Sequence, residues 1–564
     1  MCGIFFILEK EKLKIEEIKR EFEKGKKRGP ENSQLMKIEV ENGYVIYMGF
    51  HRLAINGLNT ESNQPIEEED MILICNGEIY NHKELEEKYK LEMKTGSDCE
   101  VILKMCRKEG IKKTLKEIEG VYSFVLYDKK KEIIYISRDR MGVRPLYMGI
   151  NSEEERVVVS SELKMISKLG LEKIVQYKPS HYTKIKLKEK NKMKTKRYYD
   201  IYNIKETILK TKEEEIYKRV SEGLVESVRK RIHNTERKIA CLLSGGLDSS
   251  LIASLVVELS RREGKEKEIE TYCIGLEGSP DIKYAEKVAE FIGTKHKSII
   301  VSEEEFLKAI PEVIYALESY DTTTVRASVG NYLVAKYISE NSEAKVIFNG
   351  DGSDELCGGY LYFNNIKEGK KFNEECLRLL NDIYYFDVQR SDKSIASNGL
   401  EARTPFLDTK FIEKYLSVNI KNRCHTLKDK PEKWLLRKSM EYWGEKNEAH
   451  NKKGILPKEI LYRTKEAFSD GVSDEKKSWH KIIEKKCEKM LLFDTLNKIN
   501  EPKTREQKYY RNIFNKYYGY KYDELIPYFW MPRYVKTDDP SARSLKIYKK
   551  NNTNIEEKEE KEEK

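Results

Sequence analysis

The 564-residue sequence lacks the cysteine spacings of the common metal and redox sites. Its ten cysteines form no CxxC pair, and none has a histidine at the spacing of a zinc ligand. Cys75, Cys241 and Cys273 instead stand inside apolar runs, which favours small core residues. The sequence therefore argues against a zinc module and predicts free thiols in a reducing compartment.

The sequence also has no signal peptide and no apolar run long enough to cross a bilayer. The net charge is +10, from 106 Lys and Arg against 96 Asp and Glu. Positive and negative residues are interleaved along the sequence, so no segment concentrates charge of one sign. A mixed-sign surface of this kind does not indicate a nucleic-acid-binding patch. We expect a soluble, cytoplasmic protein that binds neither nucleic acid nor membrane.

The length of the chain predicts at least two domains. Residues 184–212 are lysine-rich and lose clear strand periodicity, so we place the domain boundary near residue 205. The predicted domains are residues 2–205 and 206–545. Residues 546–564 are rich in Lys and Glu with almost nothing to bury, and we expect a disordered tail there.

The first domain opens on a cysteine at position two, followed by a buried-strand pattern from Gly3 to Leu8. The initiator Met1 is normally removed before a small residue, and this cleavage would leave Cys2 with a free α-amine. A thiol beside its own amine combines nucleophile and base in one residue, because the pKa of that amine suits proton transfer near neutral pH. An incidental cysteine beside the start codon is the alternative.

Six motifs follow Cys2 along the first domain. They are residues 27–31 (KRGPE), 49–55 (GFHRLAI), 76–81 (NGEIYN), 95–100 (TGSDCE), 120–128 (GVYSFVLYD) and 138–147 (RDRMGVRPLY). Together with Cys2 they resemble the glutaminase domain of class II glutamine amidotransferases. The resemblance implies an N-terminal-nucleophile hydrolase with αββα layers.

The same resemblance assigns roles in the binding and hydrolysis of glutamine. Cys2 would attack the side-chain amide, while the Asn76 side chain and the Gly77 N–H would hold the oxyanion. Three further residues would bind the amino-acid end of glutamine. Arg52 would bind the α-carboxylate, and Glu78 and Asp98 would bind the α-ammonium. Taken singly, Asn76-Gly77 is also a hairpin signal and Asp98 a helix N-cap.

The second domain is organised around residues 244–250, which read SGGLDSS. The apolar run 238–243 before them predicts a buried parallel strand, and the run 251–257 after them predicts a helix. The two glycines let the backbone approach a ligand, and the free N–H groups at the helix start attract an anion. No Lys follows the glycines, so this is not the phosphate loop G-x-x-x-x-G-K-[ST]. A plain turn with an N-cap is the alternative.

Strands and helices alternate around this loop. We predict strands at 269–275, 298–301 and 345–349, and helices at 213–232, 282–291, 304–315 and 329–339. The alternation predicts a doubly wound parallel sheet that binds ligands at the carboxyl ends of its strands. Residues 349–355 (NGDGSDE) fall at such an end. Asp248 and Asp354 are natural Mg²⁺ ligands there, with an acidic surface turn as the alternative.

The SGGLDSS loop resembles the pyrophosphate-binding loop of the ATP pyrophosphatase family, whose members adenylate a carbonyl and release pyrophosphate. Motifs at 318–328, 350–360, 401–408 and 463–472 narrow the resemblance to members that amidate aspartate. Ten residues would bind ATP: Leu243, Ser244, Gly245, Gly246, Asp248, Ser249, Ser250, Ile274, Asn349 and Gly350. Thr323, Arg326 and Glu355 would bind aspartate. Lys465 would stabilise charge at the α-phosphorus, and Asp351 would help to remove a proton from ammonia.

The combined resemblance implies a reaction in two coupled halves. Hydrolysis of glutamine at Cys2 would release ammonia, and ATP with Mg²⁺ would adenylate the β-carboxyl of aspartate. Ammonia, from glutamine or free in solution, would then displace AMP. One alternative is a relative that acts on another carboxylate. A second alternative is an inactive binding or regulatory protein. The sequence retains Cys2, Asp248 and Lys465, which argues against this second alternative. The oligomeric state stays open, with a homodimer as one option.

Overall fold

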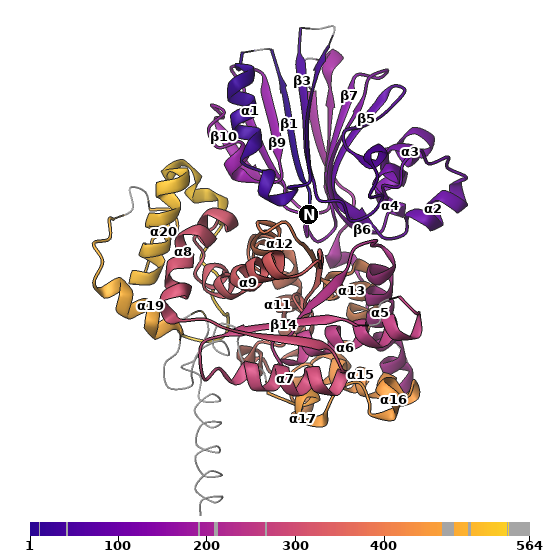
Figure 1. Cartoon of the computed structure of the whole chain (residues 1–564), viewed down its shortest axis with the longest axis vertical. Coiled ribbons are helices and arrows are strands. Elements are labelled where there is room, and N and C mark those ends of the chain that lie inside the picture. The colour runs from indigo at the N-terminus through magenta and orange to yellow at the C-terminus, as the bar shows by residue number, and fades with distance from the viewer. Residues whose placement is uncertain are drawn as a thin grey trace, which may run out of the picture.

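The computed structural model describes residues 1–10, 12–40, 43–189, 192–207, 212–265, 268–464, 479–494, 498–537 and 540. The expected tail at 546–564 lies outside the described residues. The chain forms two stacked parts, a β-sandwich of N-terminal residues and a larger α/β part (Figure 1). The N-terminus lies at the junction between them, so the candidate nucleophile sits where the two parts meet.

The sandwich consists of two six-stranded antiparallel sheets. The first has the order β10 (Lys173–Gln176), β8 (Tyr147–Asn151), β9 (Arg156–Ser160), β1 (Gly3–Glu9), β3 (Val45–Arg52) and β2 (Asn32–Glu39). The second has the order β12 (Lys192–Arg197), β11 (His181–Lys186), β7 (Ile133–Arg138), β6 (Gly120–Asp128), β5 (Met71–Ile79) and β4 (Ile66–Glu68).

Strand β1 is apolar from Gly3 to Leu8 because both of its faces are covered. Ile4, Phe6 and Leu8 pack into the core between the two sheets, and Phe5 and Ile7 face the layer of helix α1 (Ile15–Glu23). On the second sheet, α2 (His82–Tyr89), α3 (Glu100–Glu109) and α4 (Ile111–Glu117) form the other outer layer. The expected αββα layering is confirmed.

The lysine-rich stretch before the domain boundary is more ordered than its sequence pattern indicates. Residues 192–197 form β12, which pairs with β11 in register at the edge of the second sheet. All six residues of β12 are exposed. An edge strand with two exposed faces has no apolar alternation to detect, and its lysines protect the edge from further pairing. Weak strand periodicity in this stretch therefore does not mean that strands are missing from it.

The larger part contains a five-stranded parallel sheet. Its order is β15 (Lys295–Ile300), β14 (Glu270–Gly275), β13 (Ile239–Leu242), β16 (Val346–Phe348) and β17 (Glu401–Arg403). The chain runs outward from β13 to β15 and then returns to the other side of β13 to form β16. This reversal creates a switch point between β13 and β16, where doubly wound sheets bind ligands. The expected fold is confirmed, with the short β17 as an additional strand.

Helices surround this sheet. Those that precede or follow its first strands are α5 (Glu213–His233), α6 (Leu247–Arg262), α7 (Pro280–Ile292), α8 (Glu303–Leu317) and α9 (Thr322–Asn341). Later ones are α10 (Ser353–Cys357), α11 (Gly369–Asp382), α12 (Asp387–Ala396), α13 (Thr409–Leu416), α14 (Ile420–Arg423), α15 (Trp434–Lys446), α16 (Ala449–Lys452), α17 (Lys458–Leu461), α19 (Trp479–Glu488) and α20 (Arg505–Tyr518). Helix α9 begins seven residues before the sequence pattern indicates, because Asp321 caps it by accepting from the Thr324 N–H at 3.0 Å.

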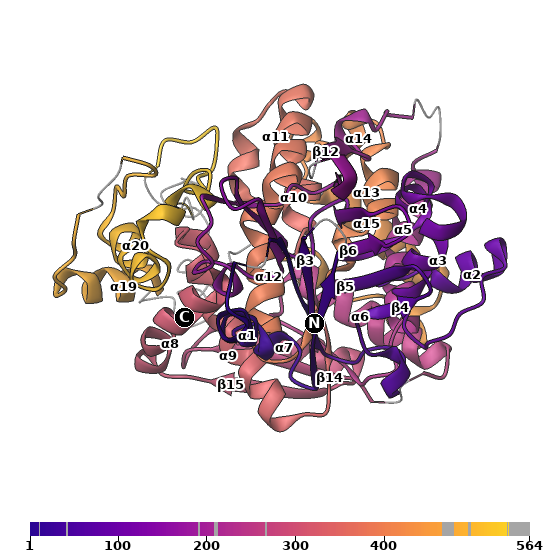
Figure 2. The same cartoon turned by 90° about the horizontal axis from the view of Figure 1, so that it is seen from above.

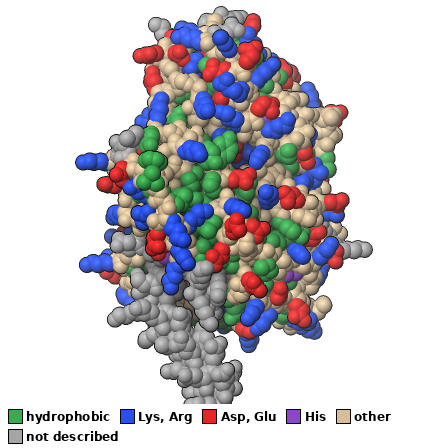
Figure 3. Space-filling model, turned by 60° about the vertical axis from the view of Figure 1, so that its left-hand side comes forward, with side chains coloured by type: hydrophobic (Ala, Val, Ile, Leu, Met, Phe, Trp, Pro, Cys, Tyr) green, Lys and Arg blue, Asp and Glu red, His purple; other side chains and the backbone are tan. Residues whose placement is uncertain are grey.

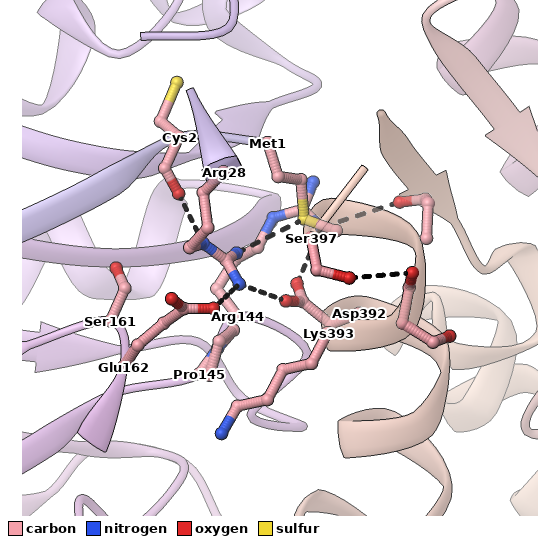
Figure 4. A network of polar contacts seen from close by, with 12 residues as sticks. Met1, Cys2, Arg28, Arg144, Pro145, Ser161, Glu162, Asp392, Lys393 and Ser397 are labelled. Carbon is pink, nitrogen blue, oxygen red and sulfur yellow. Dashed lines mark hydrogen bonds and ion pairs between the residues drawn. The ribbon is translucent and has the colours of Figure 1, made fainter. Parts of the chain in front are cut away.

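Buried charges join the two parts. The Arg28 guanidinium lies between the Cys2 carbonyl, 2.8 Å from Nε, and Asp392 of α12, 2.9 Å from Nη1 (Figure 4). Arg144 pairs with Glu401 at 3.2 Å. Seen from above, the sandwich lies over the middle of the larger part, whereas α19 and α20 lie to one side (Figure 2). The interface therefore connects the start of β1 with the strands and helices around the switch point.

The surface carries both signs of charge. Lys and Arg side chains are interspersed with Asp and Glu on the face drawn in Figure 3, as the sequence predicts. Within the described ranges, no helix combines the length and apolar character that a membrane span needs.

Candidate active sites

The candidate nucleophile lies at the junction end of the sandwich. Gly3 pairs with His51, so Cys2 comes opposite Arg52 at the end of β3. The Cys2 thiol donates to the Leu53 carbonyl at 3.5 Å. Cys2 is the one partly exposed cysteine of the ten, and the other nine are buried. Burial of the sulfur raises the pKa of the Cys2 thiol, and the nearby terminal ammonium opposes this rise.

Met1 is still attached and is completely buried. Its amine donates to the Leu400 carbonyl at 3.1 Å, and burial lowers the pKa of this amine to about 5. The α-nitrogen of Cys2 is therefore part of a peptide bond and has no basic lone pair. Only removal of Met1 would create the free amine that the nucleophile-and-base hypothesis requires.

Asn76 and Gly77 lie inside strand β5, where they pair with Ser123 and Tyr122 of β6. The hairpin alternative is thereby excluded. Asn76 is fully buried, and neither of its side-chain polar atoms has a hydrogen-bond partner among the residues that the structure describes. A buried amide in this state is costly unless a ligand satisfies it, which suits an oxyanion donor. At Gly77 a Cβ atom would lie 2.3 Å from the Val121 carbonyl oxygen, so only glycine fits.

The two acidic residues predicted to bind the α-ammonium meet at the end of β5. Asp98 does not cap α3, and its Oδ2 accepts instead from the Ile79 N–H at 2.7 Å. Glu78 is buried and accepts from the Asn56 amide at 2.8 Å. Burial and the nearby Asp98 carboxylate raise the pKa of Glu78 well above its usual range. A cationic group beside the two carboxyl groups would lower this pKa again.

Arg52 points into the adjacent loop. Its Nη1 donates to the Asn59 carbonyl at 2.8 Å and to Asn63 Oδ1 at 2.7 Å, and its Nη2 donates to the Gly57 carbonyl. Because these partners are neutral, the guanidinium keeps its full charge for a carboxylate ligand.

The second site lies at the switch point of the parallel sheet, as predicted. The loop after β13 and the loop after β16 approach each other there, since a Cβ at Gly350 would lie 2.7 Å from the Ser249 backbone nitrogen. Gly245 has a φ of +71°, which favours glycine. Helix α6 begins at Leu247, and the Ser244 and Ser249 hydroxyls lie 3.0 Å apart beside its N-terminus. The loop can therefore bind an anion in the expected manner.

One pocket includes most of the residues predicted for this site. Its walls contain Leu243, Ser244, Gly246, Asp248, Ser249, Ile274, Asn349, Gly350, Asp351, Asp354 and Glu355. Val334 and Tyr272 extend its apolar side, which suits a nucleobase. Gly245 and Ser250 do not line the pocket, and Ser250 is fully buried.

Four cations in the pocket wall were missed as site residues by the sequence reasoning: Arg390, Lys433, Arg437 and Arg463. Lys433 is 1% exposed, and its Nζ lies 2.6 Å from both Asp248 Oδ2 and Asp354 Oδ1. Asp248 and Asp354 therefore face the same ammonium. In a chain with 106 Lys and Arg, no local pattern distinguishes Lys433.

Asp351 and Glu355 have different partners in the same wall. Asp351 pairs with Arg390 at 2.6 Å, and Arg390 also contacts Asp387 at 3.2 Å. The Tyr360 hydroxyl donates to Glu355. Burial raises the pKa of Glu355 well above its usual range, and the Asp387 and Asp354 carboxylates add to this rise.

The remaining predicted residues are not brought to this pocket. Arg326 forms a two-pronged ion pair with Glu506 of α20, at 3.1 and 2.6 Å. Thr323 donates to Asp321 at 2.7 Å in the first turn of α9. Neither residue lines the pocket. Lys465 lies outside the described residues.

Comparisons with known proteins agree with this arrangement of two sites. Residues 1–218 match the family described as "Glutamine amidotransferase domain", and residues 219–370 and 364–524 match the family described as "Asparagine synthase". Fold, sites and matches together define an amidotransferase joined to a synthetase that uses ATP.

Relatives match along nearly the whole chain. The glutamine-hydrolysing asparagine synthetase of Cricetulus griseus is 39% identical over 548 residues, which cover 93% of this chain and 94% of the relative. Those of Gallus gallus and Homo sapiens are 39% and 38% identical, with the same coverage. The chain belongs to the family of glutamine-hydrolysing asparagine synthetases.

Proposed function

We propose that this chain makes asparagine from aspartate, with glutamine as nitrogen donor and ATP as the activating substrate. One observation carries the proposal: a single chain holds both the candidate nucleophile Cys2, its one partly exposed cysteine, and a pocket at the switch point that the pyrophosphate loop lines. Among the described residues the buried Asn76 amide has no hydrogen-bond partner, which suits an oxyanion donor.

The first half of the reaction is the hydrolysis of glutamine. Cys2 attacks the side-chain amide after Met1 has been removed, and its amine carries the proton to the departing ammonia. Asn76 and the Gly77 N–H stabilise the oxyanion, and water then hydrolyses the thioester to glutamate. The ammonia passes through the protein interior to the second site.

The second half is the activation and amidation of aspartate. The loop at 244–250 holds the pyrophosphate end of ATP, and Leu243 and Ile274 contact the base. Asp248 and Asp354 fit Mg²⁺, which prefers one or two carboxylates together with phosphate oxygens. The ion would neutralise phosphate charge. Glu355 binds aspartate from the pocket wall, and Thr323 and Arg326 would join it only after release from Asp321 and Glu506. Lys465 stabilises the leaving pyrophosphate. Ammonia displaces AMP from β-aspartyl-AMP inside a site that excludes water.

Two further expectations concern the protein as a whole. We propose a cytoplasmic location, which the ten free thiols support. We also propose a homodimer, which light scattering of the purified protein would test.

Product identification tests the function directly. The protein is incubated with glutamine, aspartate, ATP and Mg²⁺, and asparagine, AMP and pyrophosphate are separated by chromatography. Equal amounts of the three products are expected. Pyrophosphate release with a carboxylate other than aspartate, and none with aspartate, would favour the related synthetase with another acceptor.

Asp351 provides a prediction at the amidation step. We expect Asp351→Asn to reduce asparagine formation by about 10²–10⁴-fold, because a positioned acid–base group contributes about that factor. Asp351→Glu should keep a substantial share of activity, since it retains the carboxylate. Asparagine is measured with saturating ammonia, so that glutamine hydrolysis does not limit the rate.

Asp387→Asn is the matched control for this prediction, because Asp387 shares Arg390 with Asp351. It should leave most of the activity. An equal loss in both variants would mean that the acids serve only to hold Arg390.

A further inference from the structure

The carboxylates that are proposed to bind glutamine are held by a residue of the synthetase part. Asn234 ends helix α5 and precedes β13, far along the chain from the glutaminase motifs. It is 3% exposed. Its Nδ2 donates to Glu78 Oε2 at 2.7 Å and to Asp98 Oδ2 at 3.1 Å. A side-chain amide has two N–H groups, so it serves one carboxylate with each.

The backbone of Asn234 fixes this amide independently of its side chain. The Asn234 N–H donates to the Lys230 carbonyl at 3.2 Å, which closes the last turn of α5. Its carbonyl accepts from Arg403 Nη2 at 2.9 Å and from the Asn56 amide at 3.3 Å. A substitution of the side chain leaves these contacts in place. It removes only the two bonds to the acids.

Two buried acids need such a donor. Glu78 and Asp98 are both nearly inaccessible, and like charges in that setting repel each other and lose hydration. Arg403 compensates from one side, with Nη2 3.3 Å from Glu78 Oε2. Asn234 is the residue that bonds to both acids, so it sets the position of one carboxylate relative to the other. An ammonium that binds between them depends on that spacing.

The residues after Asn234 support the loop that holds Arg52. Glu236 accepts from the Gly57 N–H at 2.7 Å, and Arg237 donates to the Ala54 carbonyl at 2.7 Å. The Gly57 carbonyl in turn accepts from Arg52. The segment 234–237 therefore bonds directly to the two acids and reaches Arg52 through Gly57.

We propose that Asn234 is a positioning residue for glutamine: its amide aligns Glu78 and Asp98, so that the glutamine pocket is complete only when the synthetase part is docked. This inference rests on the proposed function, in which those two acids bind the α-ammonium. It predicts a defect in glutamine affinity rather than in the chemistry at Cys2.

The test compares Asn234→Leu and Asn234→Ala in the full chain. Both remove the donor without adding a charge, and Leu keeps roughly the size of the side chain. We expect the KM for glutamine to rise about 10- to 100-fold, the range for hydrogen bonds to charged groups. The kcat for glutamine hydrolysis should change much less, and ammonia-dependent asparagine synthesis should stay unchanged. His233→Ala, at an exposed neighbour that contacts Glu263, should leave all three values unchanged.

Two outcomes would overturn the inference. One is an unchanged KM for glutamine in both variants. The other is a parallel loss of ammonia-dependent synthesis in both, which would show a structural role. Asp98→Asn separates this inference from the function itself: if it raises the KM while the Asn234 variants do not, only the role of Asn234 fails. Absence of glutamine hydrolysis in the parent protein would instead contradict the proposed function.

Discussion

Replacing Cys2 by Ala is expected to abolish glutamine-dependent asparagine synthesis and to leave ammonia-dependent synthesis largely intact. The nucleophile and the adenylation pocket lie in different parts of the chain and share only ammonia. Loss of a nucleophile that acts together with its base costs at least about 10⁴-fold in hydrolysis. Glutamate release from glutamine and asparagine formation from ammonium salts are measured side by side.

Cys106→Ala is the control for this substitution. Cys106 is a buried thiol of α3 in the same sandwich, and its removal should leave hydrolysis in place. If Cys2→Ala still releases glutamate at the parent rate, the nucleophile is not Cys2. If it loses synthesis from ammonia as well, the two sites are not separable in the way proposed.

Replacing Lys433 by Met is expected to abolish pyrophosphate release with either nitrogen source, while glutamine hydrolysis continues. Lys433 is the buried cation that Asp248 and Asp354 share, each at 2.6 Å. Without it the two carboxylates repel each other in the pocket wall, and the phosphates lose a nearby positive charge. Loss of one charged donor at such a transition state costs about 10²–10³-fold.

Lys438→Met is the matched control, because Lys438 lies on α15, the helix that Lys433 precedes. Its ammonium contacts Glu441 and the rings of Trp434 and Tyr462, none of which lines the pocket. It should retain normal pyrophosphate release. Thermal unfolding of both variants separates a damaged fold from a damaged site. Pyrophosphate release within a fewfold of the parent in a folded Lys433→Met would assign the charge stabilisation to another pocket cation.

The sequence predicts the fold well wherever one local pattern decides the structure. Residues 238–257 contain an apolar strand pattern, two glycines and an apolar helix pattern in immediate succession. The structure forms β13, the loop and α6 from them. Asn76 and Gly77 show the limit of a dipeptide signal: the same two residues favour a hairpin, yet they lie inside β5, where they pair with β6.

The parts that escaped prediction depend on long-range contacts. Lys433 acquires its place only when α15 packs beside a loop 185 residues earlier in the chain. In the sequence Asn234 is an ordinary residue at a helix end. Its bonds to Glu78 and Asp98 form only when the sandwich packs against this helix. Arg326 shows the converse: its predicted substrate contact is replaced in this structure by an ion pair with Glu506, 180 residues away. No local pattern encodes such pairings.

The burial of Met1 places a constraint on the biogenesis of the enzyme. An aminopeptidase must reach the N-terminus, but the Met1 amine is bonded to Leu400, in a segment that the ribosome makes much later. If Cys2 is the nucleophile as proposed, the trimming that exposes its amine would precede the docking of the segment around Leu400. In a chain that still carries Met1 when it folds, the N-terminus is buried and an aminopeptidase cannot reach it. Such a chain would keep the synthetase activity with ammonia and never acquire the glutaminase.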